Sequence, residues 1–411
     1  MADRSSSEGG SDLRVILMIQ ALRALVYGFG SVILGAALAN AGYSDAQVGL
    51  VFTAMLAGFA VMSIVVGTIG DRFGRRRLYA GLFVVMAVTG TAFAFSDSIV
   101  LLAVLALSGT ISVEANESGP ITSIEQAMIA HAAPAADRRT AAFARYNAVA
   151  FFAGSIGSLI AGGPDALRRF FPSLPANQRF LAAYLVVGVA CSLLARRLSS
   201  QVEAGSELTP GRRFPLVRSK GRVAGLAGLF AVDSFAGGFV IQSFIVFWFH
   251  RKFGASTEVM GLVFFFGGLL QAFSSIAAGW VANRIGLLNT MVFTHLPSNV
   301  LLLLVPFMPS LPLAIAVLLA RFAISQMDVP ARQAYVVTIV GPEERTAASA
   351  YTNTARYVVR PAGPALGGQL MQAVNIGAPF VIAGALKIVY DLALLATFRR
   401  VGEPEAATRS G

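Results

Sequence analysis

The chain has 411 residues, of which 56% are hydrophobic and 13% charged, and its mean hydropathy is +0.69. Soluble domains carry about 25% charged residues, so this composition excludes an ordinary soluble protein and indicates a chain that crosses a membrane several times. The net charge of +11 does not indicate nucleic-acid binding, because the arginines lie mostly in short loops between apolar runs. The single cysteine excludes an internal disulfide.

The chain begins with a polar stretch, residues 1–12, that is more acidic than basic, and we expect it to be a disordered cytoplasmic tail. A spanning helix needs about 20 apolar residues, and we find twelve such runs in the rest of the chain. They are 13–40, 45–68, 78–96, 98–131, 140–162, 179–200, 222–252, 256–282, 288–308, 311–340, 345–374 and 377–399. The fourth run contains Pro120, where we expect a bend.

The loop between the second and third runs reads Gly67-Thr-Ile-Gly-Asp71-Arg72-Phe-Gly74-Arg75-Arg76-Arg77. It is short, basic and rich in glycine, which predicts a tight turn on the cytoplasmic side, where Lys and Arg accumulate. A second basic segment, 201–221, contains Pro210 and Pro215. We expect it to be a cytoplasmic linker between an N-terminal six-helix bundle (13–200) and a C-terminal one (222–400), with a cytoplasmic tail at 401–411.

The sequence repeats internally. Gly42 through Arg72 aligns with Gly254 through Arg284 at an offset of 212 residues, and Asn283 then stands where the first copy has Asp71. Farther on, Arg139-Thr-Ala-Ala142 recurs as Arg345-Thr-Ala-Ala348 at an offset of 206. These repeats predict two structurally similar halves.

The loop spacing G-x-x-x-D-R-x-G-R-R and the two similar halves resemble the major facilitator superfamily of transporters. The resemblance implies an all-α fold with twelve transmembrane helices in two pseudo-symmetric six-helix bundles, and a substrate site between the bundles near the membrane midplane. It also implies that the signature loops help to close a cytoplasmic gate. Our candidate gate residues are Gly67, Asp71, Arg72, Gly74, Arg75, Glu125, Arg332, Asn283 and Arg284. The alternative is that the basic residues only anchor the loops to lipid headgroups.

Ionisable residues inside the predicted spans are costly and therefore suggest function. The candidates for substrate binding or coupling are Arg23, Glu114, Glu117, Asp233, Arg321, Asp328, Arg356 and Arg360. At an offset of 207, Glu114 corresponds to Arg321 and Glu125 to Arg332. We expect these acids and bases to pair across a central cavity, with Arg23 and Asp233 as a third pair. The alternative is that each charge pairs with a nearby group and only joins helices.

Three further interpretations concern a charge pair in the last span, a histidine in the ninth span and the carboxylates that would carry a coupled proton. Lys387 and Asp391 are spaced i,i+4, which predicts a pair within one helix, and His295 is expected to have a packing role. Glu114 and Glu117 are our candidates for proton coupling, because a carboxylate near apolar surface gains and loses a proton as its surroundings change. Four deep cations oppose four deep anions, so the charges do not reveal the sign of the solute.

The sequence contains no histidine cluster with metal-ligand spacing, no Walker loop and no nucleophile–base set. We therefore expect no metal, no cofactor and no enzymatic activity. We predict a secondary active transporter of the plasma (inner) membrane, with both termini cytoplasmic. It would move a small polar or anionic organic solute by alternating access, coupled to protons. Its partners would be the solute, protons and the lipid bilayer, with no nucleic acid, and it would be a monomer.

Two alternatives stay open. One is a drug/proton antiporter that exports amphipathic compounds. Such antiporters carry G-P-x-x-G-G in the fifth span, whereas here the fifth span lacks the proline and the eleventh reads Gly363-Pro364-Ala-Leu-Gly367-Gly368, which weakens this assignment. The other is a receptor of the same fold that transports nothing, because fold does not fix function.

Overall fold

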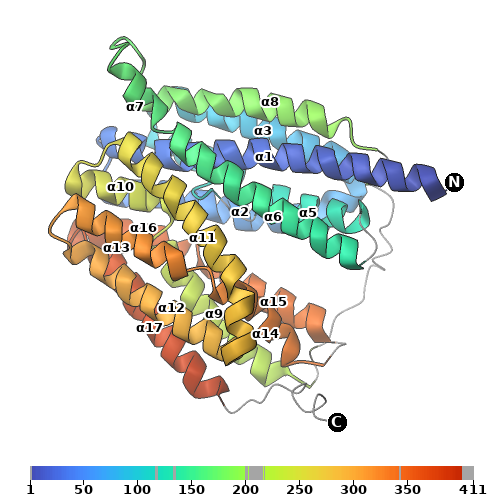
Figure 1. Ribbon diagram of the computed structural model, residues 1–411. Coiled ribbons are helices and arrows are strands. Elements are labelled where there is room, and N and C mark those ends of the chain that lie inside the picture. Colours follow the sequence, from blue (N-terminus) through green and yellow to red (C-terminus); the bar gives the residue numbers. More distant parts are fainter. Residues whose placement is uncertain are drawn as a thin grey trace. The chain divides into compact units, whose positions relative to one another are not determined.

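The computed structural model describes residues 2–115, 119–132, 136–199, 202, 216, 218–341 and 344–399, without the side chains of 2–10, 69–72, 130–132, 136–141 and 346. All regular secondary structure in this described part is helical (Figure 1). The first half contains α1 (Ala2–Asn40), α2 (Asp45–Phe73), α3 (Arg75–Phe95), α4 (Ile99–Ala106), α5 (Pro120–Ala132), α6 (Ala136–Ile160), α7 (Gly163–Arg168), η1 (Asn177–Ala182) and α8 (Ala183–Ala195).

The second half begins with α9 on the far side of the predicted linker. It contains α9 (Lys220–Gly238), α10 (Gln242–Phe253), α11 (Thr257–Ile285), α12 (Leu287–Leu304), η3 (Val305–Phe307), α13 (Leu311–Ile324), α14 (Asp328–Thr338), α15 (Arg345–Val359), α16 (Ala362–Ala373) and α17 (Ala378–Phe398). The predicted all-α, polytopic fold is confirmed.

Ten helical segments of the described part are long and apolar enough to cross a membrane. The two predicted spans outside this set are the fourth and the eleventh, and both are interrupted. In the fourth, the helix stops at Ala106 and resumes at Pro120, where a proline is favourable because the first turn needs no backbone N–H. In the eleventh, α15 ends at Val359 and α16 begins at Ala362. Shorter breaks separate α9 from α10 and α13 from α14.

The start of the chain differs from our expectation of a disordered tail at 1–12, because α1 already begins at Ala2. The Asp12 side chain is buried and accepts hydrogen bonds from the backbone N–H of Ser199, at 2.9 Å, and from its hydroxyl, at 2.6 Å. A contact of this kind fixes the early turns of α1 to the segment that follows α8, which a free tail would not have.

The predicted tight turn of the signature loop is confirmed at Gly74, whose φ of +82° lies in the left-handed region that favours glycine. Gly286 has a φ of +83° at the equivalent turn between α11 and α12, 212 residues later. The internal repeat is thus visible in the backbone. Gly67 makes no close contact with the described residues, since a Cβ there would have no described heavy atom within 4 Å.

The chain forms two compact units. The first unit consists of Met1–Pro210 and Ile241–Phe266, and the second of Gly211–Val240 and Gly267–Gly411. One boundary falls inside the predicted linker, 201–221. The segment Ile241–Phe266, which contains α10 and the start of α11, belongs to the first unit by its contacts, although the sequence groups it with the second half.

In the first unit α1 lies along α6 and α8, and α3 lies along α8 (Figure 1). Glycines allow α1 and α6 to approach closely. A Cβ added at Gly28 would lie 2.0 Å from the carbonyl oxygen of Gly154, and one at Gly157 would lie 2.0 Å from the carbonyl oxygen of Leu25. Small residues at such contacts are the usual means by which membrane helices pack tightly.

In the second unit α9 lies against α15 and α17, and α12 lies against α17 (Figure 1). Glycines again allow a close approach of the backbones, since a Cβ at Gly238 would lie 2.4 Å from the carbonyl oxygen of Arg360 and 3.1 Å from the Cα of Gly363. Gly28 and Gly238 are 210 residues apart. Gly28 lets the first span approach the fifth, and Gly238 lets the seventh span approach the eleventh, which are the corresponding spans of the repeat. An apolar core that includes Phe230 and Val292 fills the unit beside these contacts.

Candidate functional site

The break in the fourth span places polar backbone within a segment predicted to cross the membrane. Residues 107–115 and 119 are not helical, and Gly109 turns the chain with a φ of +62°. A Cβ at Gly109 would lie 2.5 Å from the carbonyl oxygen of Gly58 on α2, so only glycine fits there. Glu114 is half-buried in this break, and its backbone N–H and carbonyl both bond to the Ser112 hydroxyl.

Groups from other helices of the first unit bind the non-helical backbone of this break. Tyr27 of α1 donates its hydroxyl to the carbonyl of Thr110 at 3.0 Å. The backbone N–H and hydroxyl of Ser243 both donate to the carbonyl of Val113 at 3.1 Å. The side-chain oxygen of Gln242 accepts a hydrogen bond from the backbone N–H of Ala115 at 3.1 Å. Irregular backbone at membrane depth needs such partners, and it is tolerated where it is buried in protein or lines a cavity.

A buried cluster centred on Glu125 joins four helices of the first unit. Glu125 of α5 is fully buried and forms an ion pair with Arg23 of α1 at 2.7 Å. Its carboxylate also accepts the hydroxyl of Tyr79 from α3 at 2.7 Å and that of Tyr146 from α6 at 2.5 Å. Arg23 further donates to Gln20 and Tyr146. Both charges are therefore paired and hydrogen-bonded, which is the condition under which buried ions are tolerated.

A second buried cluster, centred on Asp233 of α9, joins helices of the second unit. Lys387 of α17 lies 2.5 Å from one oxygen of Asp233, and Arg332 of α14 lies 3.3 Å from the other. Arg332 also pairs with Asp328 at 3.1 Å, one turn earlier on α14. These four side chains are all more than nine-tenths buried. The cluster therefore connects α9, α14 and α17 through charged groups.

The Asp233 cluster continues through His295 of α12. The Nδ1 of His295 lies 2.8 Å from Asp391 on α17, and its Nε2 lies 3.8 Å from Asp233. Asn299 donates to the second oxygen of Asp391 at 2.9 Å. Asp391 is therefore bound by α12, and the pairing of Lys387 with Asp391 that the sequence spacing predicts is wrong, because Lys387 binds Asp233 instead.

The predicted pairing between halves is also wrong for four residues. Arg23 binds Glu125 rather than Asp233, and Arg332 binds Asp233 and Asp328 rather than Glu125. The physical reason is that each residue finds an opposite charge on a helix of its own unit. Glu125 and Arg332, which we assigned to the cytoplasmic gate, are buried members of these clusters.

The remaining predicted coupling residues are more scattered. Arg321 lies in the last turn of α13 with its guanidinium 5.7 Å from the ring of Phe322. Arg356 lies in the last turn of α15, and Arg360 follows at the break before α16. Glu117 lies outside the described residues. The pair expected between Glu114 and Arg321 stays a prediction.

The candidate gate residues lie around the two signature turns. Gly74 and Arg75 form the turn between α2 and α3, while the side chains of Asp71 and Arg72 lie outside the described residues. At the end of α11, Asn283 and Arg284 are exposed, and the guanidinium of Arg284 lies 3.8 Å from the centre of the Trp280 ring. Their role as a gate stays a prediction.

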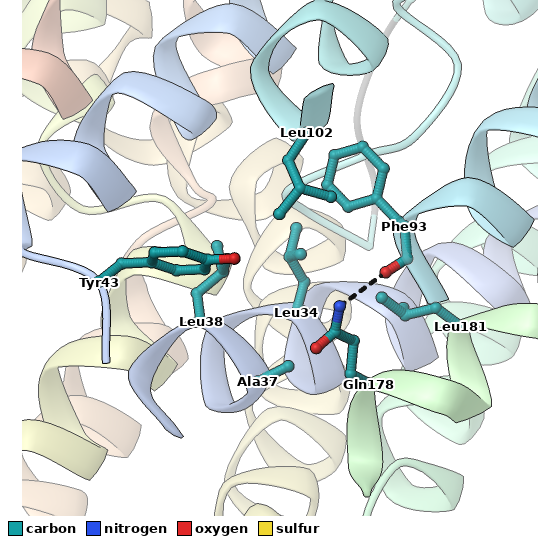
Figure 2. Close-up of a pocket in the computed structure, with 8 residues that line it drawn as sticks. All are labelled: Leu34, Ala37, Leu38, Tyr43, Phe93, Leu102, Gln178 and Leu181. Carbon is teal, nitrogen blue, oxygen red and sulfur yellow. Dashed lines mark hydrogen bonds between the residues drawn. The ribbon is translucent and has the colours of Figure 1, made fainter. Parts of the chain in front are cut away.

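A small pocket in the first unit lies apart from both clusters (Figure 2). Aliphatic and aromatic side chains from α1, α3 and α4 form most of its wall, and two polar side chains, Tyr43 and Gln178, contribute the rest. Both are already engaged. Gln178 donates to the carbonyls of Phe93 and Ser96, at 2.9 and 2.7 Å, and Tyr43 donates to the carbonyl of Asp97 at 2.6 Å. The hydrogen-bond donors of these two side chains are therefore already used within the protein.

Sequence reasoning missed or discounted several members of the clusters. Tyr79 and Tyr146 lie in apolar runs, where a tyrosine does not reveal that its hydroxyl reaches a carboxylate. For His295 we expected only a packing role, and for Lys387 only a pair with Asp391 on the same helix. The sequence feature that could have identified His295 and Lys387 is the one that identified Arg23, because an ionisable side chain inside a predicted span needs a partner.

Comparison with known proteins identifies the family. A family model described as Major Facilitator Superfamily matches residues 16–360 and 226–411. The uncharacterized membrane protein YJR124C of Saccharomyces cerevisiae is 28% identical over 421 residues, with 94% of each chain covered. The description of this relative indicates a membrane protein and names no solute.

Three solved structures share the fold. A bacterial homolog of the human lysosomal transporter Spinster, inward-facing and occupied, matches with a TM-score of 0.71 and 15% identity over 95% of each chain. The nucleoside transporter NupG matches with a TM-score of 0.73 and 13% identity, over 94% of this chain and 99% of its own. A D-xylose-proton symporter matches with a TM-score of 0.68 and 15% identity, over 93% of this chain and 97% of its own. With the family model spanning most of its length, the chain belongs to the major facilitator superfamily, whose members are secondary transporters of the membrane.

Proposed function

We propose that this protein moves a small polar or anionic organic solute across the plasma (inner) membrane by alternating access, coupled to protons. The observation that carries the proposal is the broken fourth span. Its polar backbone and half-buried Glu114 occupy the middle of a run that must cross lipid. In transporters, interrupted helices of this kind form the sites of substrates and coupling ions.

The solute class follows from the available donors. Arg356 has a buried Nε without a hydrogen-bond partner among the described residues, and a guanidinium suits a carboxylate or phosphate because its donors are planar and paired. The names of two proteins with a similar fold, a nucleoside transporter and a D-xylose-proton symporter, agree with a polar organic solute. Arg356 thus favours an anionic group on the solute, the two names favour only a polar one, and neither argument selects a compound.

The coupling proton is assigned to the carboxylates of the fourth span. Glu114 lies in the break and Glu125 lies on α5, while Glu117 stands between them in the sequence, outside the described residues. A carboxylate that exchanges its partner as the transporter changes conformation also changes its proton affinity. For Glu125 the exchangeable partner would be Arg23, which a proton on Glu125 would release to bind the solute anion.

The test is proton movement in proteoliposomes. The full chain is reconstituted in vesicles that contain a pH-sensitive dye, and organic anions, sugars, nucleosides and amphipathic cations are added outside one at a time. We expect a polar or anionic solute to change the internal pH. Glu114→Gln and Glu125→Gln should reduce this proton movement at least tenfold, because glutamine keeps the size of the side chain and cannot carry the proton.

Glu258→Gln is the matched control, since this partly exposed carboxylate pairs with Arg169 outside both the break and the Glu125 cluster, and proton movement should survive its loss. Unchanged solute-driven proton movement in both the Glu114 and Glu125 variants would overturn the assignment. A response confined to amphipathic cations would favour drug export, and binding of a solute without transport would favour a receptor.

We also propose that both termini and the signature loops are cytoplasmic, because basic loops stay on that side. Arg77, exposed at the α2–α3 turn, provides the test. In a Cys191→Ala background, Arg77→Cys should not react with a membrane-impermeant thiol reagent added to intact cells, and it should react after the cells are opened. Labelling in intact cells would reverse the orientation.

A further inference from the structure

The first part of the eleventh span, α15, carries a polar edge. Asn353 precedes Arg356 by three residues and Tyr357 by four, and Arg360 follows Arg356 by four, so the four side chains lie along one side of the helix. Asn353 and Tyr357 are exposed, and the two arginines are half-buried. A row of polar groups thus follows α15 through a run that is predicted to cross lipid.

This polar edge is suited to water and not to lipid. In hydrocarbon, an amide or a guanidinium finds no hydrogen-bond partner. The exposed large hydrophobic side chains of α15, Tyr351 and Val358, are seven residues apart and lie on a different flank of the helix. That flank suits lipid, whereas the polar edge suits a water-filled space.

Helix α15 is held against α9 without the side chains of this edge. Ser234 of α9 donates its hydroxyl to the backbone carbonyl of Arg356 at 2.9 Å. A Cβ added at Gly238 would lie 2.4 Å from the carbonyl oxygen of Arg360, so the two backbones lie in contact there. Both contacts use backbone atoms of α15, and neither needs a guanidinium group.

The fifth span offers a comparison, because it corresponds to the eleventh at an offset of 206 residues. In the first unit a Cβ at Gly28 would meet the carbonyl oxygen of Gly154, as one at Gly238 would meet that of Arg360 in the second. Gly154 and Arg360 are themselves 206 residues apart. The two backbones therefore occupy corresponding positions in their units.

The two arginines have no counterpart in the fifth span. At the same offset Arg356 corresponds to Ala150, Tyr357 to Phe151, and Arg360 to a glycine. The fifth span thus packs in its unit without either charge. Because a charge inside a span is costly and the packing does not require it, the arginines indicate a function that belongs to the second unit.

Arg356 has hydrogen-bonding capacity that the described residues do not use. Its Nε is buried and has no hydrogen-bond partner among them. Asp233 and Asp328 attract Arg356 through space, but both bond to Arg332. With Arg356 counted and His295 uncharged, the Asp233 cluster is neutral, because Arg332, Lys387 and Arg356 balance Asp233, Asp328 and Asp391. Arg356 therefore lacks an acceptor for its Nε–H and not a counter-charge.

A carboxylate group on a solute matches this need. Its two oxygens accept the paired N–H groups of a guanidinium, and Arg360 adds a second positive charge one turn away on the same edge. Asn353 lies about 5 Å nearer the start of the helix, and Tyr357 lies beside it. Their amide and hydroxyl suit a second polar group on the same solute.

We propose that the polar edge of α15 is a binding site for a small organic carboxylate that carries a second hydrogen-bonding group. The guanidinium of Arg356 binds the carboxylate, and Asn353 and Tyr357 bind the second group. Binding at this edge does not depend on the proposed function; only the transport of the bound solute rests on it.

The test is ligand binding by the detergent-purified full chain, measured as the rise in its unfolding temperature with increasing ligand concentration. The probes are short and medium-chain monocarboxylates, the same acids with a terminal hydroxyl, and the primary amide of each acid. We expect hydroxylated carboxylates to stabilise the protein most and the uncharged amides to have no effect. If no carboxylate stabilises the wild type more than its amide does, the proposal is wrong.

Arg356→Lys separates hydrogen bonding from charge, because lysine keeps a cation near Asp233 and Asp328 but lacks the planar pair of donors. Affinity for the carboxylates should fall at least about tenfold. Arg345→Lys is the matched control, since this arginine lies in the first turn of the same helix and donates to the carbonyl of Val337, and its affinity should equal that of the wild type. Equal affinities of the wild type and Arg356→Lys would overturn the site.

Asn353→Ala and Tyr357→Phe test the second group, and they keep the proposal testable if Arg356→Lys does not fold. Both side chains are exposed, so the fold should tolerate these changes. Each variant should lose preference for the hydroxylated over the plain carboxylates, and an unchanged preference in both would contradict the assignment. Proteoliposomes that respond to other solutes, with no carboxylate bound in this assay, would remove this site and leave the proposed function standing. Carboxylate binding without any proton movement would leave the site and remove the coupling.

Discussion

The two units hold related buried ion pairs of opposite polarity. In the first unit the cation, Arg23, lies on the first span and the acid, Glu125, on the fourth. In the second unit the acid, Asp233, lies on the seventh span and the cation, Arg332, on the tenth. The positions correspond at offsets of 210 and 207 residues. Both units therefore hold an ion pair between corresponding spans, but the cation and the acid have exchanged places.

The surroundings of the two pairs differ more than the pairs do. In the first unit the remaining acceptor capacity of the carboxylate is filled by tyrosine hydroxyls. In the second unit it is filled by Lys387 and approached by His295. The first cluster therefore holds one fixed pair, whereas the second shares its charges among several partners. Loss of one partner should be costly in the first and partly compensated in the second.

The largest effect is expected for Glu125→Ala, which leaves Arg23 buried without its carboxylate. Stranding one member of a buried pair costs about 3–5 kcal/mol, enough to lower the yield of folded protein sharply. Reversible unfolding of detergent-purified protein in increasing SDS measures the loss. Stability within about 1 kcal/mol of the wild type would mean that Arg23 finds another acceptor and that the first pair is not fixed.

Next in size is Gly28→Ala, whose Cβ would lie 2.0 Å from the carbonyl oxygen of Gly154. Overpacking of this kind costs about 1–3 kcal/mol, and Gly238→Ala should cost a similar amount in the second unit. The same SDS unfolding assay applies. Gly228→Ala on α9 is the matched control, because a Cβ there meets no described atom within 4 Å, and it should be neutral or slightly stabilising. Equal effects at Gly28 and Gly228 would contradict the close approach.

Arg332→Gln should cost less than Glu125→Ala, because Asp233 keeps Lys387 at 2.5 Å and the glutamine amide can still donate to Asp328. We expect about 2 kcal/mol, typical for lost hydrogen bonds to a charged group. Arg23→Gln, which leaves Glu125 with no cation, is the comparison in the first unit and should cost more. Equal losses for the two arginine variants in the unfolding assay would remove the proposed difference between the clusters.

The smallest effect is expected for Arg169→Ala, which removes the pair with Glu258. Its side chain is 67% exposed, and exposed pairs contribute about 0–1 kcal/mol. The loss should shrink further at high salt, because salt screens exposed charges. A loss of stability larger than that of Arg332→Gln would show that the contribution of these ion pairs to stability does not follow their burial.

The sequence predicted the parts of the fold that depend on composition and local backbone. Apolar runs located the spans, and glycine placement located the first signature turn, at Gly74. It did not predict the breaks in the seventh, tenth and eleventh spans, because a broken helix in lipid is stabilised by groups from distant helices. Ser274, for example, accepts the backbone N–H of Gln326 at 3.2 Å.

Which charges matter was also visible in the sequence, but their partners were not. The offset of 207 relates Glu125 to Arg332 by symmetry, and symmetry does not bring side chains into contact. The partner of Glu125 is set by the packing of α1 beside α5 and α6, which places Arg23 2.7 Å away. Likewise, Lys387 and Asp391 are neighbours on one helix, yet they point to different partners on α9 and α12.

The most direct test of this account is a double-mutant cycle on Arg23 and Glu125, with stability measured by SDS unfolding. We expect Arg23→Gln and Glu125→Gln to be strongly non-additive, with a coupling of about 2–3 kcal/mol, and the double variant to be more stable than either single variant. The same cycle on Arg169 and Glu258 should give a coupling below about 1 kcal/mol. Additive losses at Arg23 and Glu125 would mean that the two charges are not partners, and would contradict the pairing within the first unit on which this account rests.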